Sequence, residues 1–305
     1  MRILFAGTPR VAVPSLNELR HAGHEVVAVL TRADAHVGRK KVLMPSPVAQ
    51  AATDAGLEII KANRIDQSVV ARLAELHLDA AAIVAYGGLV PPAALQLPRF
   101  GWINLHFSLL PAWRGAAPVQ HALINGDDIS GASTFLLEEG LDTGPVFGTV
   151  TEPVRQEDTS GTLLERLSES GAVLLSQTLA AIEQGRAVPV PQRGEVSLAP
   201  KLSSADGRVR WADPALAIKR RISGVTPEPG AWTLLAGQRV KLGAVLLRPD
   251  VEEILSGVVR ERDGAVLVGT GSHAVQLTQV QPSGRTMLPA AEWFRGSRRE
   301  DLIFE

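Results

Sequence analysis

WINLHFSLLPAWRG occupies residues 102–115. Apolar positions 103, 105 and 107 alternate with polar positions 104, 106 and 108, which is the period of a β-strand. Asn104 and His106 are therefore expected on the same face of that strand. A carboxamide has two N–H donors and an imidazole can donate, accept or carry charge near neutral pH, so together they could stabilise an oxyanion. Taken alone, such a pair is more often a hydrogen-bonded strand edge than a catalytic site.

The end of this stretch suggests a second chemistry that we weigh against the first. Pro111 is expected to stop the strand, and a helix should follow with Pro118 in its first turn. Ser108 could serve as a nucleophile, but Leu-Leu-Pro follows it instead of the glycine-flanked nucleophile elbow that such a serine needs. We therefore favour the Asn–His pair.

Strand and helix patterns alternate along the first half of the chain. Apolar runs at residues 2–6 and 24–31 read as buried strands, with a helix expected between them at 14–22. A further helix is expected at 47–55, capped by Ser46-Pro47, and the alternation continues to a long helix capped by Thr159 or Ser160. This pattern predicts an α/β fold with a doubly wound, Rossmann-like parallel sheet. The first turn lacks G-x-G-x-x-G, so a nicotinamide cofactor is not expected.

The second half of the chain has a different pattern. Residues 186–205 contain several prolines and no sustained periodicity, which indicates a linker. Beyond them, residues 211–222 are expected to form a helix with Lys219, Arg220 and Arg221 together. Short alternating strands with tight turns follow, typical of a small OB-like β-barrel. We predict a catalytic domain at 1–189, a linker at 190–206 and an OB-like domain at 207–305.

Composition narrows the class of protein. The chain has 305 residues, 45% of them hydrophobic, enough to bury the cores of two domains. It has no cysteine, which excludes disulfides, thiolate nucleophiles and cysteine-ligated zinc. No apolar run reaches the length of a membrane span, and the first six residues are too short for a signal sequence. We expect a cytoplasmic protein, and a monomer.

Cations concentrate at two places. Arg39, Lys40 and Lys41 lie in the stretch from residue 32 to 46, which is longer than a connection in an α/β unit requires. Cations also outnumber carboxylates beyond residue 206, whereas the reverse holds before it. Surplus length with charge suggests polyanion binding, and a solvated basic surface is the alternative.

Several motifs together resemble those of the folate-dependent formyltransferases. They are NLHFSLLPAWRGAAP at 104–118, GLDTG at 140–144, FAGTP at 5–9, LMPSP at 43–47 and APKLS at 199–203. The likeness covers nearly the whole chain. It implies a formyltransferase domain followed by an OB-like tRNA-binding domain. It also implies transfer of a formyl group from 10-formyltetrahydrofolate, as co-substrate and without a metal, to the free amino group of methionyl initiator tRNA for translation initiation.

The resemblance assigns roles to individual residues. Asn104 and His106 would stabilise the oxyanion, and Asp142 would orient His106, favour its protonated form and help to move protons. Main chain would hold the pterin of the folate, at Tyr86, Gly87, Gly88, Leu89, Val90, Ser108, Leu109, Leu110, Pro111, Glu138, Gly140 and Leu141. The cations that would contact tRNA are Arg39, Lys40, Lys41, Arg114, Lys201, Lys219, Arg220 and Arg221.

Three positions depart from the pattern of that family. Arg10 and Val11 stand where an acidic and an aromatic residue are usual, and Glu228 replaces an aromatic residue. Two other functions stay open on the sequence alone. One is formyl transfer to a small amine, such as an amino sugar or a purine precursor. The other is a catalytically silent RNA-binding protein.

Overall fold

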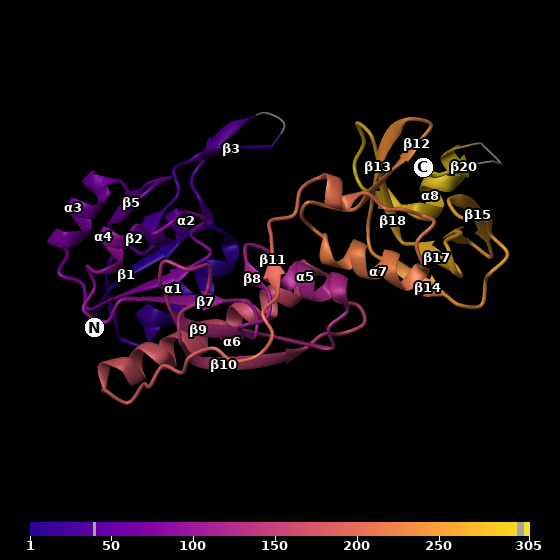
Figure 1. Ribbon diagram of the computed structural model, residues 1–305. Coiled ribbons are helices and arrows are strands. Elements are labelled where there is room, and N and C mark those ends of the chain that lie inside the picture. The colour runs from indigo at the N-terminus through magenta and orange to yellow at the C-terminus, as the bar shows by residue number, and fades with distance from the viewer. Residues whose placement is uncertain (39–40, 298–301) are drawn as a thin grey trace. The chain divides into compact units, whose positions relative to one another are not determined.

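The computed structural model describes residues 1–38, 41–297 and 302–305. By their contacts, the described residues group into two compact units. The first unit comprises Met1–Gly115, Ile129–Pro153 and Leu164–Leu198; the second comprises Ala116–Asp128, Val154–Leu163 and Ala199–Glu305. Figure 1 shows the course of the chain through these elements.

A mixed β-sheet forms the centre of the first unit. Within the described residues it has seven strands in the order β10-β9-β7-β6-β1-β2-β5. Their bounds are β1 Arg2–Gly7, β2 Glu25–Thr31, β5 Ile59–Lys61, β6 Ala80–Val84, β7 Trp102–His106, β9 Ile129–Leu136 and β10 Val146–Pro153. The five neighbouring strands β7, β6, β1, β2 and β5 run parallel, as predicted. In contrast, β9 pairs antiparallel with β7 and with β10, so the predicted parallel sheet has an antiparallel edge.

Two helices of the first unit begin at residues whose side chains cap them. α2 (Pro47–Asp54) is capped by Ser46, whose hydroxyl accepts from the Ala49 N–H at 3.0 Å. The Asp66 carboxylate caps α3 (Gln67–Glu75) in the same way. The other helical segments are η1 Arg10–Ala12, α1 Val13–His21 and α4 Pro92–Leu95. α6 runs from Ser160 to Glu183, with Thr159 accepting from the Thr162 N–H, which confirms the expected cap.

The described residues of the basic stretch after β2 include a hairpin of two short strands, where a loop was expected. β3 (Ala35–Val37) pairs antiparallel with β4 (Val42–Met44). In Figure 1 this hairpin extends away from the body of the sheet. Its second strand exposes large apolar side chains, with Leu43 at 59% exposed. Arg39 and Lys40 lie outside the described residues.

The second unit is built around an antiparallel β domain flanked by helices, consistent with the predicted OB-like fold. Its strands form two sheets, β12-β13-β18-β19 and β14-β17-β16-β15-β20, in the part of the chain that the structure describes. Their bounds are β12 Trp232–Leu235, β13 Gln238–Leu242, β14 Val245–Arg248, β15 Val258–Arg262, β16 Ala265–Val268, β17 Ala274–Leu277, β18 Gln279–Pro282, β19 Leu288–Pro289 and β20 Leu302–Ile303. The helices are α7 Ala215–Gly224 and α8 Ala290–Ser297, and a 3-10 turn, η2, spans Ala205–Gly207.

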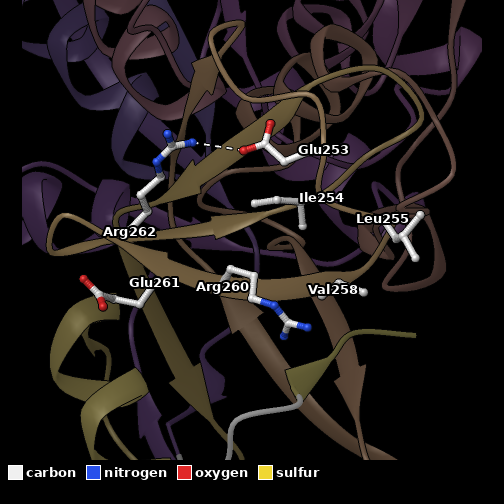
Figure 2. Close-up of a pocket in the computed structure, with 7 residues that line it drawn as sticks. All are labelled: Glu253, Ile254, Leu255, Val258, Arg260, Glu261 and Arg262. Carbon is white, nitrogen blue, oxygen red and sulfur yellow. Dashed lines mark hydrogen bonds and ion pairs between the residues drawn. The ribbon is translucent and has the colours of Figure 1, made fainter.

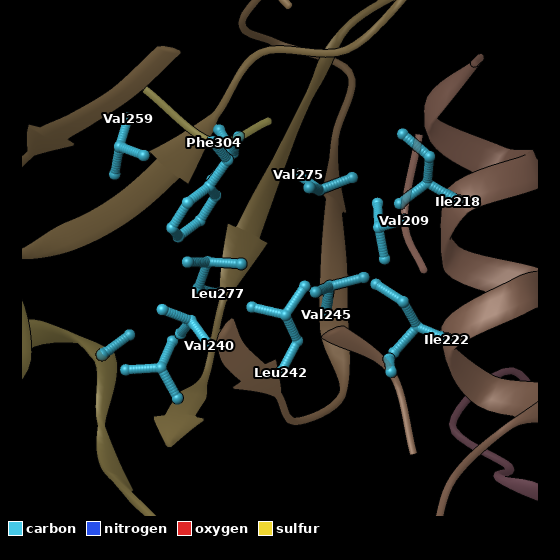
Figure 3. Close-up of a cluster of buried hydrophobic side chains, with 14 of the residues drawn as sticks. Val209, Ile218, Ile222, Val240, Leu242, Val245, Val259, Val275, Leu277 and Phe304 are labelled. Atoms are coloured by element: carbon cyan, nitrogen blue, oxygen red, sulfur yellow. The ribbon is translucent and has the colours of Figure 1, made fainter. Parts of the chain in front are cut away.

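Valine, leucine and isoleucine side chains from these strands and from α7 fill one core (Figure 3). Phe304, which directly follows β20, is part of this core: its ring stacks on Trp211 and on Trp293 with centroid distances of 5.4 and 5.8 Å. Trp211 was expected to begin a helix, but it packs in this core and α7 begins only after Pro214. A helix that began at Trp211 would contain this proline, which has no N–H to donate and disfavours the α conformation of the residue before it, and this explains the later boundary.

The compact units do not follow a linear division of the chain. α5 (Pro118–Asn125) groups with the second unit because it packs against α7. The residues predicted to form a linker include β11 (Leu198–Ala199) and make hydrogen bonds within both units. The boundaries at 189 and 206 stay predictions. Within the described ranges, no helix is both long and apolar enough to cross a lipid bilayer.

Candidate active site

The candidate site lies where parallel strands of the first unit end. Asn104 of β7 is opposite Ile83 of β6, and Val84 at the end of β6 is opposite Gly7 of β1. Loops that follow parallel strands meet at the carboxyl edge of a sheet, where α/β proteins bind their ligands. Asn104 is half-buried there, and its carboxamide makes no hydrogen bond to any residue that the structure describes. Its donors are therefore available to a ligand.

His106 is buried two residues further along β7, with 7% of its surface exposed. Its Nε2 lies 2.9 Å from the Trp113 carbonyl oxygen. Because a carbonyl only accepts, we assign the proton of the neutral ring to Nε2. Nδ1 is then the free nitrogen, and it lies 3.6 Å from Oδ2 of Asp142. Only Nδ1 is left to take part in proton transfer.

Asp142 reaches this position from the turn between β9 and β10. Its backbone has φ of 50°, a left-handed conformation that is uncommon for a residue other than glycine. The Gly115 N–H donates to Oδ2 at 2.7 Å. Gly144 closes the turn, and a Cβ there would lie 1.7 Å from the Leu136 carbonyl oxygen, so no other residue fits without a shift of the backbone.

Opposing effects act on the pKa of His106. Burial is the largest, and it lowers the pKa below the ordinary value; the Asp142 charge and the bond to the Trp113 carbonyl raise it, but less. The imidazole is therefore neutral at neutral pH. Asp142 acts in the direction expected from the sequence, yet burial outweighs it. A neutral ring beside a carboxylate is suited to accept a proton and to have the resulting cation stabilised.

The predicted folate residues follow β6, β7 and β9. Leu89 and Leu141 are large apolar side chains with 91% and 60% of their surface exposed, which a flat ligand could cover. Gly87 has φ of 80°, and a Cβ on Gly88 would lie 2.7 Å from the Tyr86 ring. The remaining positions are Val90, Ser108, Leu109, Leu110, Pro111, Glu138 and Gly140, whose predicted roles stay predictions.

The Ser108 hydroxyl is not placed as a nucleophile. It donates to the Ala112 carbonyl at 2.5 Å, and the Ser108 carbonyl accepts from Ser133 Oγ at 2.7 Å. These bonds hold the turn after β7. Acyl transfer by a serine would require an imidazole base beside the hydroxyl. In the structure the Ser108 hydroxyl is paired with main chain instead.

Tyr86 supplies only main chain to the site, because its side chain belongs to the core. The ring is 1% exposed, and its hydroxyl donates to the Ala62 carbonyl at 2.7 Å. We expect Tyr86→Phe to lower the free energy of unfolding by about 1 kcal/mol, since it leaves a buried carbonyl unpaired. The Michaelis constant for folate should not change. Denaturant midpoints and steady-state kinetics test this, and a weaker folate interaction at unchanged stability would contradict it.

The predicted tRNA cations are not equally accessible. Lys41 and Lys201 are exposed. Arg114 donates from Nε and Nη2 to Gln192 Oε1, at 3.1 and 2.7 Å. The three cations of α7 are half-buried and point in different directions: Lys219 donates to the Gln156 carbonyl and Arg221 to the Asp206 carbonyl, while the Arg220 guanidinium lies against Gly126.

The second unit also contains a surface cavity of about 430 Å³ that the sequence did not indicate. Figure 2 shows that it combines apolar side chains with charges of both signs. Arg262 is paired with Glu253 at 3.0 Å at its rim. The described residues include no group of three or more His, Cys, Asp or Glu side chains arranged to hold a metal ion.

An α/β unit with this Asn–His–Asp arrangement, followed by an antiparallel β unit, defines the class of protein. The chain belongs to the formyl transferase family, whose Formyl transferase model matches residues 1–179 and whose C-terminal domain model matches residues 201–298. It is 67% identical over 306 aligned residues to the methionyl-tRNA formyltransferase of Arthrobacter sp. (strain FB24), and the match covers 100% of both chains. The methionyl-tRNA formyltransferase of Paenarthrobacter aurescens (strain TC1) is 64% identical, again over 100% of both chains.

Among solved structures, the fold is similar to that of HypX from Aquifex aeolicus in complex with tetrahydrofolic acid. The TM-score is 0.67 at 22% sequence identity, and the match covers 96% of this chain and 47% of that one. At this identity the likeness concerns the fold alone.

Proposed function

We propose that this protein transfers the formyl group of 10-formyltetrahydrofolate to the α-amino group of methionyl initiator tRNA, for translation initiation. One observation carries the proposal: the Asn104, His106 and Asp142 arrangement occurs in a chain that is 67% identical, from end to end, to a methionyl-tRNA formyltransferase. The names of these relatives favour a tRNA acceptor over a small amine, and the similar fold of a protein in complex with tetrahydrofolic acid supports a folate co-substrate. We further propose that it acts in the cytoplasm, as a monomer and without a metal.

The geometry supports a different role for each of the three side chains at the reacting carbon. The free Asn104 carboxamide would donate to the formyl oxygen as it becomes an anion. His106 would take the proton of the attacking amine on Nδ1, because its Nε2–H is bonded to the Trp113 carbonyl. The imidazolium would then donate from Nδ1 to the oxyanion. As the bond between the formyl carbon and the folate nitrogen breaks, the imidazolium would pass its proton to that nitrogen, so that tetrahydrofolate leaves. Asp142, 3.6 Å away, would stabilise that cation.

A transfer assay tests the proposal against its alternatives. The protein is mixed with 10-formyltetrahydrofolate and methionylated initiator tRNA, or with a panel of amino sugars and purine precursors. We expect formyl transfer to the tRNA and none to the small amines. Transfer to a small amine alone would identify the other formyltransferase function, and tRNA binding without any transfer would indicate a silent RNA-binding protein.

The basic hairpin offers a test of the tRNA acceptor. We expect simultaneous replacement of Arg39, Lys40 and Lys41 by Gln to raise the Michaelis constant for tRNA and to leave that for folate unchanged. The logarithm of the tRNA binding constant should also depend less steeply on the logarithm of the salt concentration. Each cation–phosphate contact that is lost should reduce the magnitude of this slope by about 0.9, if the RNA duplex has the charge density of duplex DNA. Binding measured between low and moderate salt gives the slope.

The cations of α7 serve as the comparison. Lys219, Arg220 and Arg221 are half-buried, so their joint replacement should change the slope less. Identical salt slopes for the wild type and both triple variants would mean that these charges are solvated surface, and would favour a small acceptor.

A further inference from the structure

Residues 190–197, which the sequence indicated to be part of a linker, are bonded to both loops that support the catalytic side chains. Val190 exchanges two main-chain hydrogen bonds with Val146, each 2.8 Å, at the start of β10. The segment then passes the Asp142 turn at Gln192 and the turn after β7 at Ser197. All of these residues lie in the first unit.

Gln192 makes the central contacts of this segment. Its Nε2 donates to the carbonyl oxygens of Asp142 and Gly144, at 2.7 and 2.8 Å. Both donors of one side-chain amide are therefore used on the turn that carries Asp142. The backbone of Asp142 is left-handed, a conformation that persists in such a residue only when its surroundings hold it.

Arg114 fixes the other end of the same side chain. Its Nε and Nη2 both donate to Gln192 Oε1. A planar guanidinium that bonds one oxygen through two donors restricts the orientation of the amide, so Nε2 is directed at the turn. Both side chains are half-buried.

Ser197 supports the histidine through main chain. Its hydroxyl accepts from the Trp113 N–H at 2.8 Å, and its carbonyl accepts from the Arg114 N–H at 2.9 Å. Trp113 is the residue whose carbonyl accepts from His106 Nε2. One short segment thus braces the partners of both His106 and Asp142.

We propose that Gln192 is a positioning residue for formyl transfer: it holds the Asp142 turn so that the carboxylate faces His106, and Arg114 orients it. This inference rests on the proposed catalytic role of Asp142. It also gives Arg114 a role inside the first unit, in place of a contact with tRNA. Gln192 acts through Asp142 and does not touch the substrates.

The first test compares two variants with a matched control. We expect Gln192→Ala and Gln192→Glu each to lower kcat about tenfold, because a displacement of the carboxylate by a fraction of an ångström reduces transition-state stabilisation. Glutamate keeps an acceptor for Arg114 but cannot donate to the two carbonyls. Michaelis constants for folate and tRNA should stay within about twofold. The control is Gln184→Ala, since exposed Gln184 also accepts from an arginine, Arg186, and should behave as wild type.

A titration separates positioning from general stabilisation. As Asp142 moves away in Gln192→Ala, the NMR titration midpoint of His106 should fall, because the charge that raises its pKa is then more distant. A wild-type kcat in both variants would overturn the inference. So would a change confined to the Michaelis constants, or an unchanged midpoint in a variant with reduced kcat.

A double-mutant cycle distinguishes failure of this inference from failure of the proposed function. If Gln192 acts through the Asp142 carboxylate, Gln192→Ala should cost about tenfold in the wild type and little in an Asp142→Asn background. Full activity of Asp142→Asn would refute the proposed role of Asp142 itself. An impaired Asp142→Asn in which Gln192→Ala still costs the full factor would leave that role standing and overturn the role of Gln192.

Discussion

Replacement of His106 by Ala is expected to lower kcat by about a hundredfold or more, and Asn104→Ala by about a hundredfold. Both side chains act on charge that develops only in the transition state, and the loss of one such donor typically costs about 3 kcal/mol. His106 should cost more because its Nδ1 would also accept the proton of the amine. Single-turnover rates at saturating substrates measure the effect on the chemical step directly.

Folate affinity provides the control for this prediction. The affinity for folate should be nearly unchanged in both variants, since neither side chain contributes mainly to binding the substrate in its ground state. Thermal unfolding should show that both variants fold. Unchanged single-turnover rates in both variants would exclude β7 as the catalytic strand, and a large loss of folate affinity at a normal rate would reassign the pair to binding.

Asp142→Asn is expected to fold normally and to lose about a hundredfold in kcat as well. The amide has nearly the volume of the carboxylate and can still accept from the Gly115 N–H, so the change removes charge and little else. The Asp142 charge raises the pKa of His106 against the larger lowering by burial. Without it the pKa should fall further, and the imidazolium formed during transfer should lose its stabilisation.

The sign of the pH effect makes this prediction specific. The titration midpoint of His106, followed by NMR, should lie below the ordinary histidine value in the wild type and lower still in Asp142→Asn. Asp127→Asn is a matched control, since this carboxylate lies in the second unit. A midpoint that rises, or a rate near wild type with an unchanged pH profile, would rule out electrostatic support by Asp142.

Local patterns in the sequence were sufficient for much of the fold. Alternation around Asn104 and His106 predicted β7 and their common face, and Ser46 and Thr159 marked two helix starts that the structure confirms. Such features depend on neighbours within a few residues, through backbone geometry and caps. The antiparallel pairing of β9 was not predictable in this way, because a strand's own pattern does not encode the direction of its partner.

The active site could not be predicted from local sequence patterns alone. Asp142, 36 positions after His106, could be joined to it only through a family resemblance, and the 3.6 Å separation depends on how the β9–β10 turn folds back. Sequence reasoning also missed Gln192, since a lone glutamine among prolines carries no periodic or motif signal. Likewise, adjacent cations at 219–221 appeared to be one patch, whereas successive helix positions point in different directions.

The sequence by itself determined the strand that carries Asn104 and His106, the order of the two domain types and the family, since each depends on residues close together in the chain. Tertiary structure alone decided that His106 is neutral, that Arg114 bonds Gln192, and that residues 190–197 brace the site. Gln192 and Asp142 are 50 residues apart. Burial and hydrogen bonds between residues so far apart in the sequence form only when the chain folds. The pKa of His106 and the partners of Arg114 are therefore defined only in the folded protein.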